Sequence, residues 1–453
     1  MRFSKFSPDT RRVIRNGIAV GGVSILPRVA QAVQSIVIAA RFGAGDQVDA
    51  YLAALILPQT LLIIGAQSFA TALVPAYLQR RTTDGEAAAT ELAARAFGFG
   101  IAGMAIATLG LWILGQPLIS LTAHGFADAK RDTTWVYLLW LAPLVFCQGA
   151  VAIGTALINA RDRFAWAALV PTVTPMLVIA ILVLPFAGID MRAVSIVTFV
   201  GALIEGAIVV LMARHIGLPW PRMTGKKGGG LGRLFGQNLF LAGSFIFNSG
   251  NPIIGQFFAS HAPSGIAIMN YGSKVVVALL ALAALPLATV VLPYFSAQTA
   301  QKDFVRLQRN LRHWGLVIVA VTVPATIVLI AASHPIVRIL FEHGQFTAQD
   351  TDAVVDVQRA YLIQIPAYIF GTLGGRMMVA LGLARQVFWV TIVNFVVNVG
   401  FGYILFQAMG VPGIALATSL MFIVQAILFL RILAVHLGEK AISVPDSEPA
   451  RHG

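Results

Sequence analysis

The sequence predicts an all-α polytopic membrane protein, and three observations support this class. Of the 453 residues, 58% are apolar and only 11% are charged, whereas a soluble protein has about 25% charged residues. The mean hydropathy of the chain is +0.81. About twelve apolar stretches reach the length of about 20 residues that a helix needs to cross a bilayer. An ordinary soluble enzyme is therefore nearly excluded as a class.

The apolar stretches define about twelve predicted spans, taken in order from the N-terminus. They cover residues 17–40, 50–74, 93–115, 134–158, 164–187, 192–213, 234–259, 267–296, 312–340, 357–382, 387–408 and 411–436. The first stretch is followed by Arg41 and Phe42 rather than by a small-residue cleavage site, so we interpret it as a span and not as a signal peptide. Residues 439–453 are polar and predict a tail without a fold of its own.

Basic residues alternate between the loops that connect these spans. The N-terminal tail and every second loop are rich in lysine and arginine, and the loops between them hold few cations. The basic loops contain Arg80 and Arg81; Arg161 and Arg163; Arg214, Arg222, Lys226, Lys227 and Arg233; Lys302, Arg306, Arg309 and Arg312; and Arg385. Because cytoplasmic loops carry such an excess, we predict that both termini are cytoplasmic. The net charge of +13 would then face anionic lipid, and no basic stretch is soluble enough to be a nucleic-acid-binding domain.

The two halves of the chain resemble each other. The order His124-Gly125-Phe126, Tyr137, Pro143, Ala160-Arg161-Asp162-Arg163-Phe164 returns as His343-Gly344-Gln345-Phe346, Tyr361, Pro366, Ala384-Arg385-Gln386-Val387-Phe388. The copies lie about 220 residues apart, which is six predicted spans, so both halves enter the membrane in the same direction. We therefore predict two six-helix lobes, residues 1–222 and 223–438, related by a parallel repeat. Such lobes allow alternating access to a substrate held between them.

No enzyme motif is visible in the chain. A GxxxxGK[ST] phosphate loop and an HExxH motif are both missing, and the eight histidines do not cluster. The single cysteine, Cys147, excludes an intrachain disulfide and a cysteine metal site. The sequence therefore predicts neither an enzyme, nor a bound cofactor, nor a metal site.

Polar residues inside the predicted spans are the most informative ones for function. They include Arg28, Gln31 and Gln34 in the first span, Gln67 in the second, Glu205 in the sixth, Lys274 in the eighth and Arg376 in the tenth. A charged side chain at the bilayer centre costs roughly 2.5–3.5 kcal/mol, so it must face protein or water. Cations outnumber the one clearly embedded acid, and this balance suits an anionic substrate such as a diphosphate. The alternatives are cations that reach the membrane interface and amides that hold helices together.

Two stretches of the chain carry a family resemblance. They are Leu26-Pro27-Arg28-Val29 through Ala40-Arg41-Phe42-Gly43-Ala44-Gly45, Asp49-Ala50-Tyr51, Pro58 and Gln67-Ser68-Phe69-Ala70 to Val74-Pro75, and later Phe341-Glu342-His343-Gly344-Gln345-Phe346-Thr347. These residues resemble the signatures of the MviN/MurJ family of the MOP exporter superfamily, and the match is collinear over nearly the whole chain. The resemblance implies a MATE-like fold with two six-helix lobes. It also implies flipping of undecaprenyl-diphosphate-linked sugars, above all the peptidoglycan precursor lipid II, across the bacterial inner membrane.

The resemblance carries over to individual positions. Arg28 matches a functional arginine of the first span, Asp49 matches an essential aspartate, and Lys274 stands where the family has an arginine. Two other cavity arginines of the family are replaced by Gln34 and Leu62, and an acid by Gln67. Together with the embedded polar residues, this yields the predicted substrate-binding set: Arg28, Gln31, Gln34, Asp49, Gln67, Lys274 and Arg376.

The predicted function is therefore a flippase for a polyprenyl-diphosphate-linked saccharide, with lipid II as the first candidate. The loss of two arginines keeps an exopolysaccharide or another lipid-linked oligosaccharide open as the substrate. A drug/cation antiporter of the same superfamily would need an acidic cluster in the N-terminal lobe, where Arg28 and glutamines stand instead. A non-transporting scaffold for envelope synthesis is a third class. The expected partners are the lipid-linked saccharide, the bilayer and envelope-biosynthesis proteins.

Overall fold

We describe the protein from a computed structural model, which covers residues 25–161, 164–184, 188–218, 239–286 and 304–442. All regular elements in these ranges are helices, which confirms the predicted all-α class. The first half contains α2 (Ile25–Phe42), α3 (Asp46–Leu61), the π-helical turn η2 (Leu62–Gln67), α4 (Ser68–Thr122), α5 (Asp128–Leu141), α6 (Leu144–Asn159), α7 (Phe164–Leu169), the 3₁₀ turn η3 (Val170–Thr172), α8 (Val173–Val183) and α9 (Met191–His215). The second half contains α11 (Leu239–Ala259), α12 (Gly265–Pro286), α14 (Phe304–Ala331), α15 (Ser333–Phe341), α16 (Ala348–Leu362), α17 (Ile365–Ala380), α18 (Ala384–Met409) and α19 (Val411–Ile442).

Local sequence signals set several of the helix starts. The Asp190 side chain accepts a hydrogen bond from the Ala193 N–H and caps α9. Thr347 and Asp350 form a capping box at the start of α16. Both arrangements satisfy backbone N–H groups that the first helical turn leaves without partners. These caps mark the points where the chain re-enters the apolar part of the molecule.

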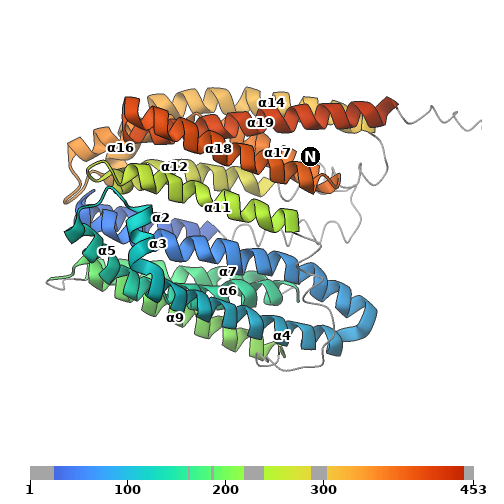
Figure 1. The fold of residues 1–453 in the computed structure, drawn as a ribbon, viewed down its shortest axis with the longest axis horizontal. Coiled ribbons are helices and arrows are strands. Elements are labelled where there is room, and N and C mark those ends of the chain that lie inside the picture. Colours follow the sequence, from blue (N-terminus) through green and yellow to red (C-terminus); the bar gives the residue numbers. More distant parts are fainter. Residues whose placement is uncertain (1–24, 162–163, 185–187, 219–238, 287–303, 443–453) are drawn as a thin grey trace, which may run out of the picture.

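Breaks and kinks in the helices alter how the predicted spans appear in the described residues. By length and composition, five described helices qualify to cross a membrane, or six if the bent pair α5 and α6 counts as one span. One of the five runs from Asp46 to Thr122, so the loop expected between residues 74 and 93 is helical on both sides of a kink at Gly85, where φ is 87°. Figure 1 shows the chain doubling back within this segment. Other predicted spans are divided, as at η3 between α7 and α8, because proline and irregular turns interrupt the helical hydrogen bonds.

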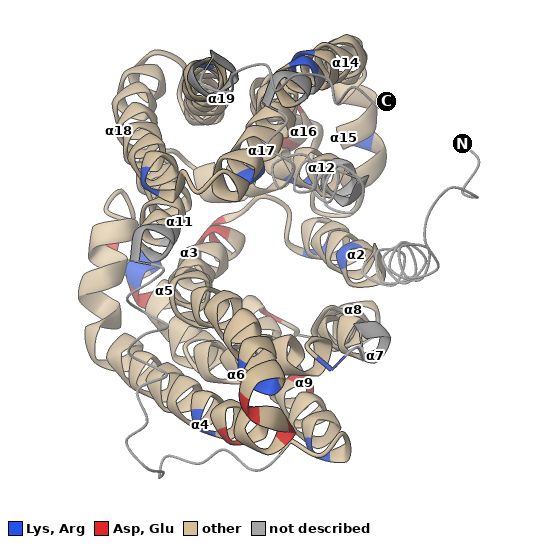
Figure 2. Ribbon diagram, turned by 90° about the vertical axis from the view of Figure 1, so that its right-hand side faces the viewer, with Lys and Arg blue, Asp and Glu red and all other residues tan. Residues whose placement is uncertain are grey.

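The helices form two groups on either side of a central region. In Figure 2, α3 to α9 occupy the lower half and α11 to α19 the upper half, with α2 at the edge between them. One buried cluster lies entirely within residues 73–218 and another within residues 276–437. A third cluster combines residues of both groups, from Ile38 to Ile414. The predicted lobe boundary between residues 222 and 223 lies outside the described residues.

The two groups contact each other closely at one end. The Gln345 N–H donates to the Ala40 carbonyl at 2.8 Å, the Tyr271 hydroxyl to the Gly43 carbonyl at 3.2 Å, and the Gly125 N–H to Ser260 Oγ at 3.1 Å. These residues lie in the loops and helix ends that the charge pattern predicts to face outward. The groups are therefore closed against each other at the predicted outer end of the molecule.

Candidate functional site

Two cavities lie between the helix groups. The N-side cavity, of about 300 Å³, is lined mainly by α2, α3, α6, α8 and α9 and by one face of α12. The C-side cavity, of about 670 Å³, is lined mainly by α11, α12, α17 and α19 and by parts of α2 and α3. They share five lining residues: Leu52, Leu55, Gln59, Asn270 and Lys274. The two cavities are thus adjacent parts of one polar region between the groups.

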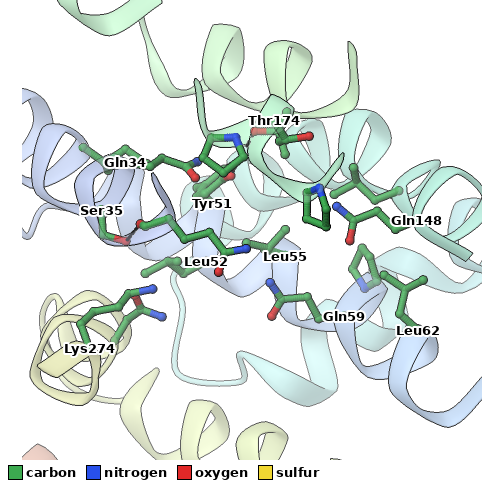
Figure 3. Close-up of a pocket in the computed structure, with 18 of the residues that line it drawn as sticks. Gln34, Ser35, Tyr51, Leu52, Leu55, Gln59, Leu62, Gln148, Thr174 and Lys274 are labelled. Atoms are coloured by element: carbon green, nitrogen blue, oxygen red, sulfur yellow. Dashed lines mark hydrogen bonds between the residues drawn. The ribbon is translucent and has the colours of Figure 1, made fainter. Parts of the chain in front are cut away.

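Lys274 occupies the wall common to both cavities. It lies in the third turn of α12, and its side chain is partly exposed. Within the described part of the chain it forms neither an ion pair nor a hydrogen bond. Figure 3 shows its side chain extending into the N-side cavity, across from α2 and α3. A lysine ammonium that faces a cavity without a protein partner is available to bind an anion.

Helix α2 brings three of the predicted residues to the cavities. The spacing of i, i+3 and i+6 places Arg28, Gln31 and Gln34 along one side of the helix. Arg28 lines the C-side cavity, and Gln31 and Gln34 line the N-side cavity. Leu62, from η2, is a wall of the N-side cavity as well. The resemblance expects arginines at positions 34 and 62. In this chain the N-side cavity is therefore lined there by an amide, Gln34, and by an aliphatic side chain, Leu62.

Asp49 lies outside both cavities, although it belongs to the predicted substrate-binding set. It is fully buried, and Lys130 Nζ of α5 donates to its Oδ2 at 2.8 Å. The Ala267 N–H, in the first turn of α12, donates to its Oδ1 at 2.6 Å. Lys130 also binds Asp46 and lies over the Phe126 ring. The structure therefore places Asp49 in a contact between the two helix groups and not on a cavity wall.

Two other predicted residues also lie away from the cavities. Gln67 is exposed at the end of η2, and Arg376 is partly exposed on α17. Neither lines the N-side or the C-side cavity. The structure thus brings together four members of the predicted set, Arg28, Gln31, Gln34 and Lys274.

The cavity walls also contain polar residues outside the predicted set. Amide side chains recur on them, from Gln59, Gln148, Asn248, Asn251, Gln256, Asn270 and Gln364. Such amides supply both donors and acceptors, as saccharide hydroxyl groups require. Their sequence signal was only that of single polar residues in apolar helices, which more often join helices than bind ligands. Asn251 lines the C-side cavity and also joins two helices, because the Asn398 side-chain amide of α18 donates to its Oδ1 at 2.9 Å.

Glu205, which the sequence identifies only as an embedded acid, is a further wall residue of the N-side cavity. It lies on α9 and is 2% exposed. Its Oε1 accepts a hydrogen bond from the Thr174 N–H at 2.9 Å. Thr174 is the second residue of α8, where backbone N–H groups lack partners within their own helix. Glu205 therefore ties α9 to the start of α8 while it faces the cavity.

Two bundled helix groups with a cationic cavity between them define a two-lobed membrane transporter. A structure entitled lipid II flippase MurJ, in an inward closed conformation, has the same fold: the TM-score is 0.78 at 20% identity, covering 94% of this chain and 90% of that one. An inward-facing multidrug resistance transporter of the MATE family has a TM-score of 0.76 at 13% identity, covering 95% of this chain and 100% of that one.

Sequence comparison identifies the family. The family model described as lipid II flippase MurJ matches residues 38–443. A probable lipid II flippase MurJ from Rhizobium meliloti (strain 1021) is 27% identical over 92% of this chain and 79% of its own length. The lipid II flippase MurJ of Thermosipho africanus (strain TCF52B) is 24% identical over 92% of this chain and 85% of its own length. The chain belongs to the MurJ family, which confirms the resemblance seen in the sequence.

Proposed function

We propose that this protein is a flippase that moves an undecaprenyl-diphosphate-linked saccharide, with lipid II as the first candidate, across the bacterial inner membrane. The observation that carries the proposal is the Lys274 ammonium, which has no partner in the described residues and faces both cavities between the helix groups. Membership of the MurJ family supports the class of substrate. The proposal needs neither a cofactor nor a catalytic residue.

The proposed cycle begins with the cavities open to the cytoplasm. The loop charges assign the closed end to the outer face and both termini to the cytoplasm. Lys274 and Arg28 would hold the diphosphate, and the amides of the walls would bind the saccharide. The lipid tail would remain in the bilayer. Rocking of the two groups would then expose the headgroup on the outer side.

Complementation tests this function. We expect the wild-type chain to support growth of a bacterium depleted of its own lipid II flippase. Lys274→Ala should abolish rescue, because it removes the cation common to both cavities, whereas its level in the membrane should stay unchanged on an immunoblot. Arg338→Ala is the control, because Arg338 is 67% exposed and pairs with Glu342 away from the cavities. Full rescue by Lys274→Ala would contradict the assignment of the diphosphate site.

A second candidate substrate is a different lipid-linked oligosaccharide. Gln34 and Leu62 line the N-side cavity at positions where the family resemblance expects cations. Loss of these two cations weakens or rearranges the diphosphate site, and this favours a substrate other than lipid II. Absence of rescue despite good membrane expression would favour this substrate, and a missing exopolysaccharide in a deletion strain would then identify it.

A further inference from the structure

The carboxylate of Glu205 is not explained by anion binding. Among the residues that line the two cavities it is the one acid, opposite the two cations Arg28 and Lys274. A negative charge in this place repels a diphosphate and so weakens binding of the proposed substrate. A buried carboxylate is also costly in itself unless it has partners. The hydrogen bond from the Thr174 N–H needs an oxygen but no charge, so the charge of Glu205 requires a further explanation.

The geometry places Glu205 and Lys274 on opposite sides of the same cavity. Glu205 lies on α9 of the first helix group and Lys274 on α12 of the second. Both line the N-side cavity, and within the described residues they form no ion pair with each other or with any other group. The Thr174 N–H holds the carboxylate in place at 2.9 Å, whereas the ammonium has no described partner. The cavity thus separates a fixed anion on one group from a cation on the other.

Among the described residues that line the N-side cavity, Lys274 is the one charged residue besides Glu205. Of the helices that pack on α9, α6 contributes Gln148 and the Cys147 thiol, and α8 contributes Thr174. Tyr51 of α3 forms a hydrogen bond with Thr198 of α9. These groups are neutral at ordinary pH. Arg28 lines the C-side cavity and not the wall on which Glu205 lies.

An alternating-access carrier must return through its closed state without substrate. The substrate's diphosphate balances Arg28 and Lys274 on the outward step, but on the return step these cations would be enclosed alone. Enclosing an uncompensated charge in a low-dielectric interior is unfavourable, and it slows the return. Closure of the empty cavity brings α9 and α12 together, and with them a carboxylate and an ammonium.

We propose that Glu205 and Lys274 form an ion pair when the cavity closes empty, and that the substrate's diphosphate displaces Glu205 from Lys274 when the cavity is loaded. This inference rests on the proposed flippase function. It makes Glu205 a positioning residue for the return step and not a part of the diphosphate site. It also explains why an acid lies in a cavity for an anion.

Two transport assays distinguish this role from other roles of Glu205. In net flipping the carrier returns empty, and in exchange it returns with a lipid bound. The test uses the full chain in vesicles that carry a fluorescent polyprenyl-diphosphate saccharide, with or without the unlabelled lipid in the opposite leaflet. Glu205→Gln keeps an oxygen for the Thr174 N–H and removes the charge. We expect net flipping to fall about tenfold, which corresponds to about 1.4 kcal/mol. Exchange should stay at or above the wild-type rate, because a loaded carrier needs no Glu205 for its return.

The matched control is Glu91→Gln, the same chemical change at a glutamate that is 64% exposed and paired with Arg95. It should leave both rates unchanged. A parallel loss of net flipping and exchange in Glu205→Gln would overturn the inference, as would wild-type rates in both assays. Absence of flipping and exchange by the wild-type chain would instead contradict the proposed function.

A second measurement tests the approach of the two residues independently of flipping. Glu205→Cys and Lys274→Cys are combined in a Cys147→Ser background, because Cys147 packs against Gly206 beside Glu205. A short bis-maleimide is the cross-linker, because a disulfide requires Cα atoms within about 7 Å, and a Glu–Lys pair spans more. We expect the bis-maleimide to cross-link the two cysteines in vesicles that contain no lipid-linked saccharide. Absence of this cross-link would overturn the inference.

Discussion

Asp46 and Asp49 show how strongly one residue's surroundings decide its role. Both lie in the first turn of α3 and both bind Lys130. The Asp46 side chain is 79% exposed, whereas Asp49 is fully buried and also accepts the Ala267 N–H of the other helix group. Exposed ion pairs contribute about 0–1 kcal/mol, but a buried donor that loses its partner costs about 1–3 kcal/mol.

We therefore predict that Asp49→Ala lowers the thermal stability of the detergent-purified protein clearly more than Asp46→Ala does. The larger loss follows from the buried Ala267 N–H, which Asp49→Ala leaves without an acceptor, in addition to the weakened Lys130 contact. A fluorescence melting curve of each variant measures the difference. Equal decreases in melting temperature for Asp49→Ala and Asp46→Ala would show that the Asp49 contact between the helix groups adds no stability beyond the Lys130 ion pair.

The same residues show what sequence alone could predict about the site. Arg28, Gln31, Gln34 and Lys274 could be assigned to a cavity, because a polar side chain in an apolar span must face protein or water. Asp49 was assigned to the substrate set, yet its partner Ala267 lies 218 positions away. No periodicity connects two such distant residues. Glu205 and Lys274 could each be recognised as embedded, but their position on the walls of the same cavity could not.

At the scale of elements, hydropathy predicted where the chain is apolar but not where its helices break. Hydropathy predicted a connection between residues 74 and 93, but not that it is helical on both sides of a kink at Gly85. The division of the fifth predicted span at η3 arises from backbone conformation and packing, which a window of mean hydropathy averages out. The π-helical turn η2 is similar, since its residues are as apolar as those of α3. The helical class and the two spans on either side of Gly85 were thus predictable, and the helical conformation of the connection between them was not.

The loop between α15 and α16 provides the element-scale prediction. Gly344 has φ of +63°, and a Cβ at this position would lie 2.1 Å from the Ala40 carbonyl oxygen of α2. An added methyl group must therefore push the two helix groups apart at the predicted outer end, because the neighbouring atom belongs to the backbone. We expect Gly344→Ala to loosen the closed end.

Cysteine accessibility measures this loosening. Ala44→Cys is a suitable reporter, because Ala44 is 4% exposed beside the contact and the native Cys147 is itself buried. Gly344→Ala should raise labelling of this reporter by a membrane-impermeant maleimide. Gly382→Ala is the control, since Gly382 has φ of +78° but open space around it. If Gly382→Ala raised labelling equally, the effect would come from backbone strain and not from the contact.

At the scale of the whole molecule, the two helix groups carry their charged residues through the proposed transport cycle. Arg28, Lys274 and Glu205 move with the protein in both directions, so their contributions cancel over a complete turnover. Only the charge of the substrate is transferred from one side to the other. A membrane potential therefore acts on the substrate's charge, and the side chains of the cavity determine how fast the cycle runs.

This distinction leads to the last prediction, in vesicles with an imposed potassium diffusion potential. Moving one charge across 100 mV corresponds to about 2.3 kcal/mol, or about 4.6 kcal/mol for a diphosphate with two charges. The labelled lipid should therefore accumulate in the leaflet facing the positive side and return to an even distribution when an ionophore removes the potential. Glu205→Gln should reach the same final distribution more slowly, because it alters a rate and not the transferred charge. A final distribution that differs between wild type and Glu205→Gln would mean that this residue carries an ion of its own across the membrane, and the return-step role would then be wrong.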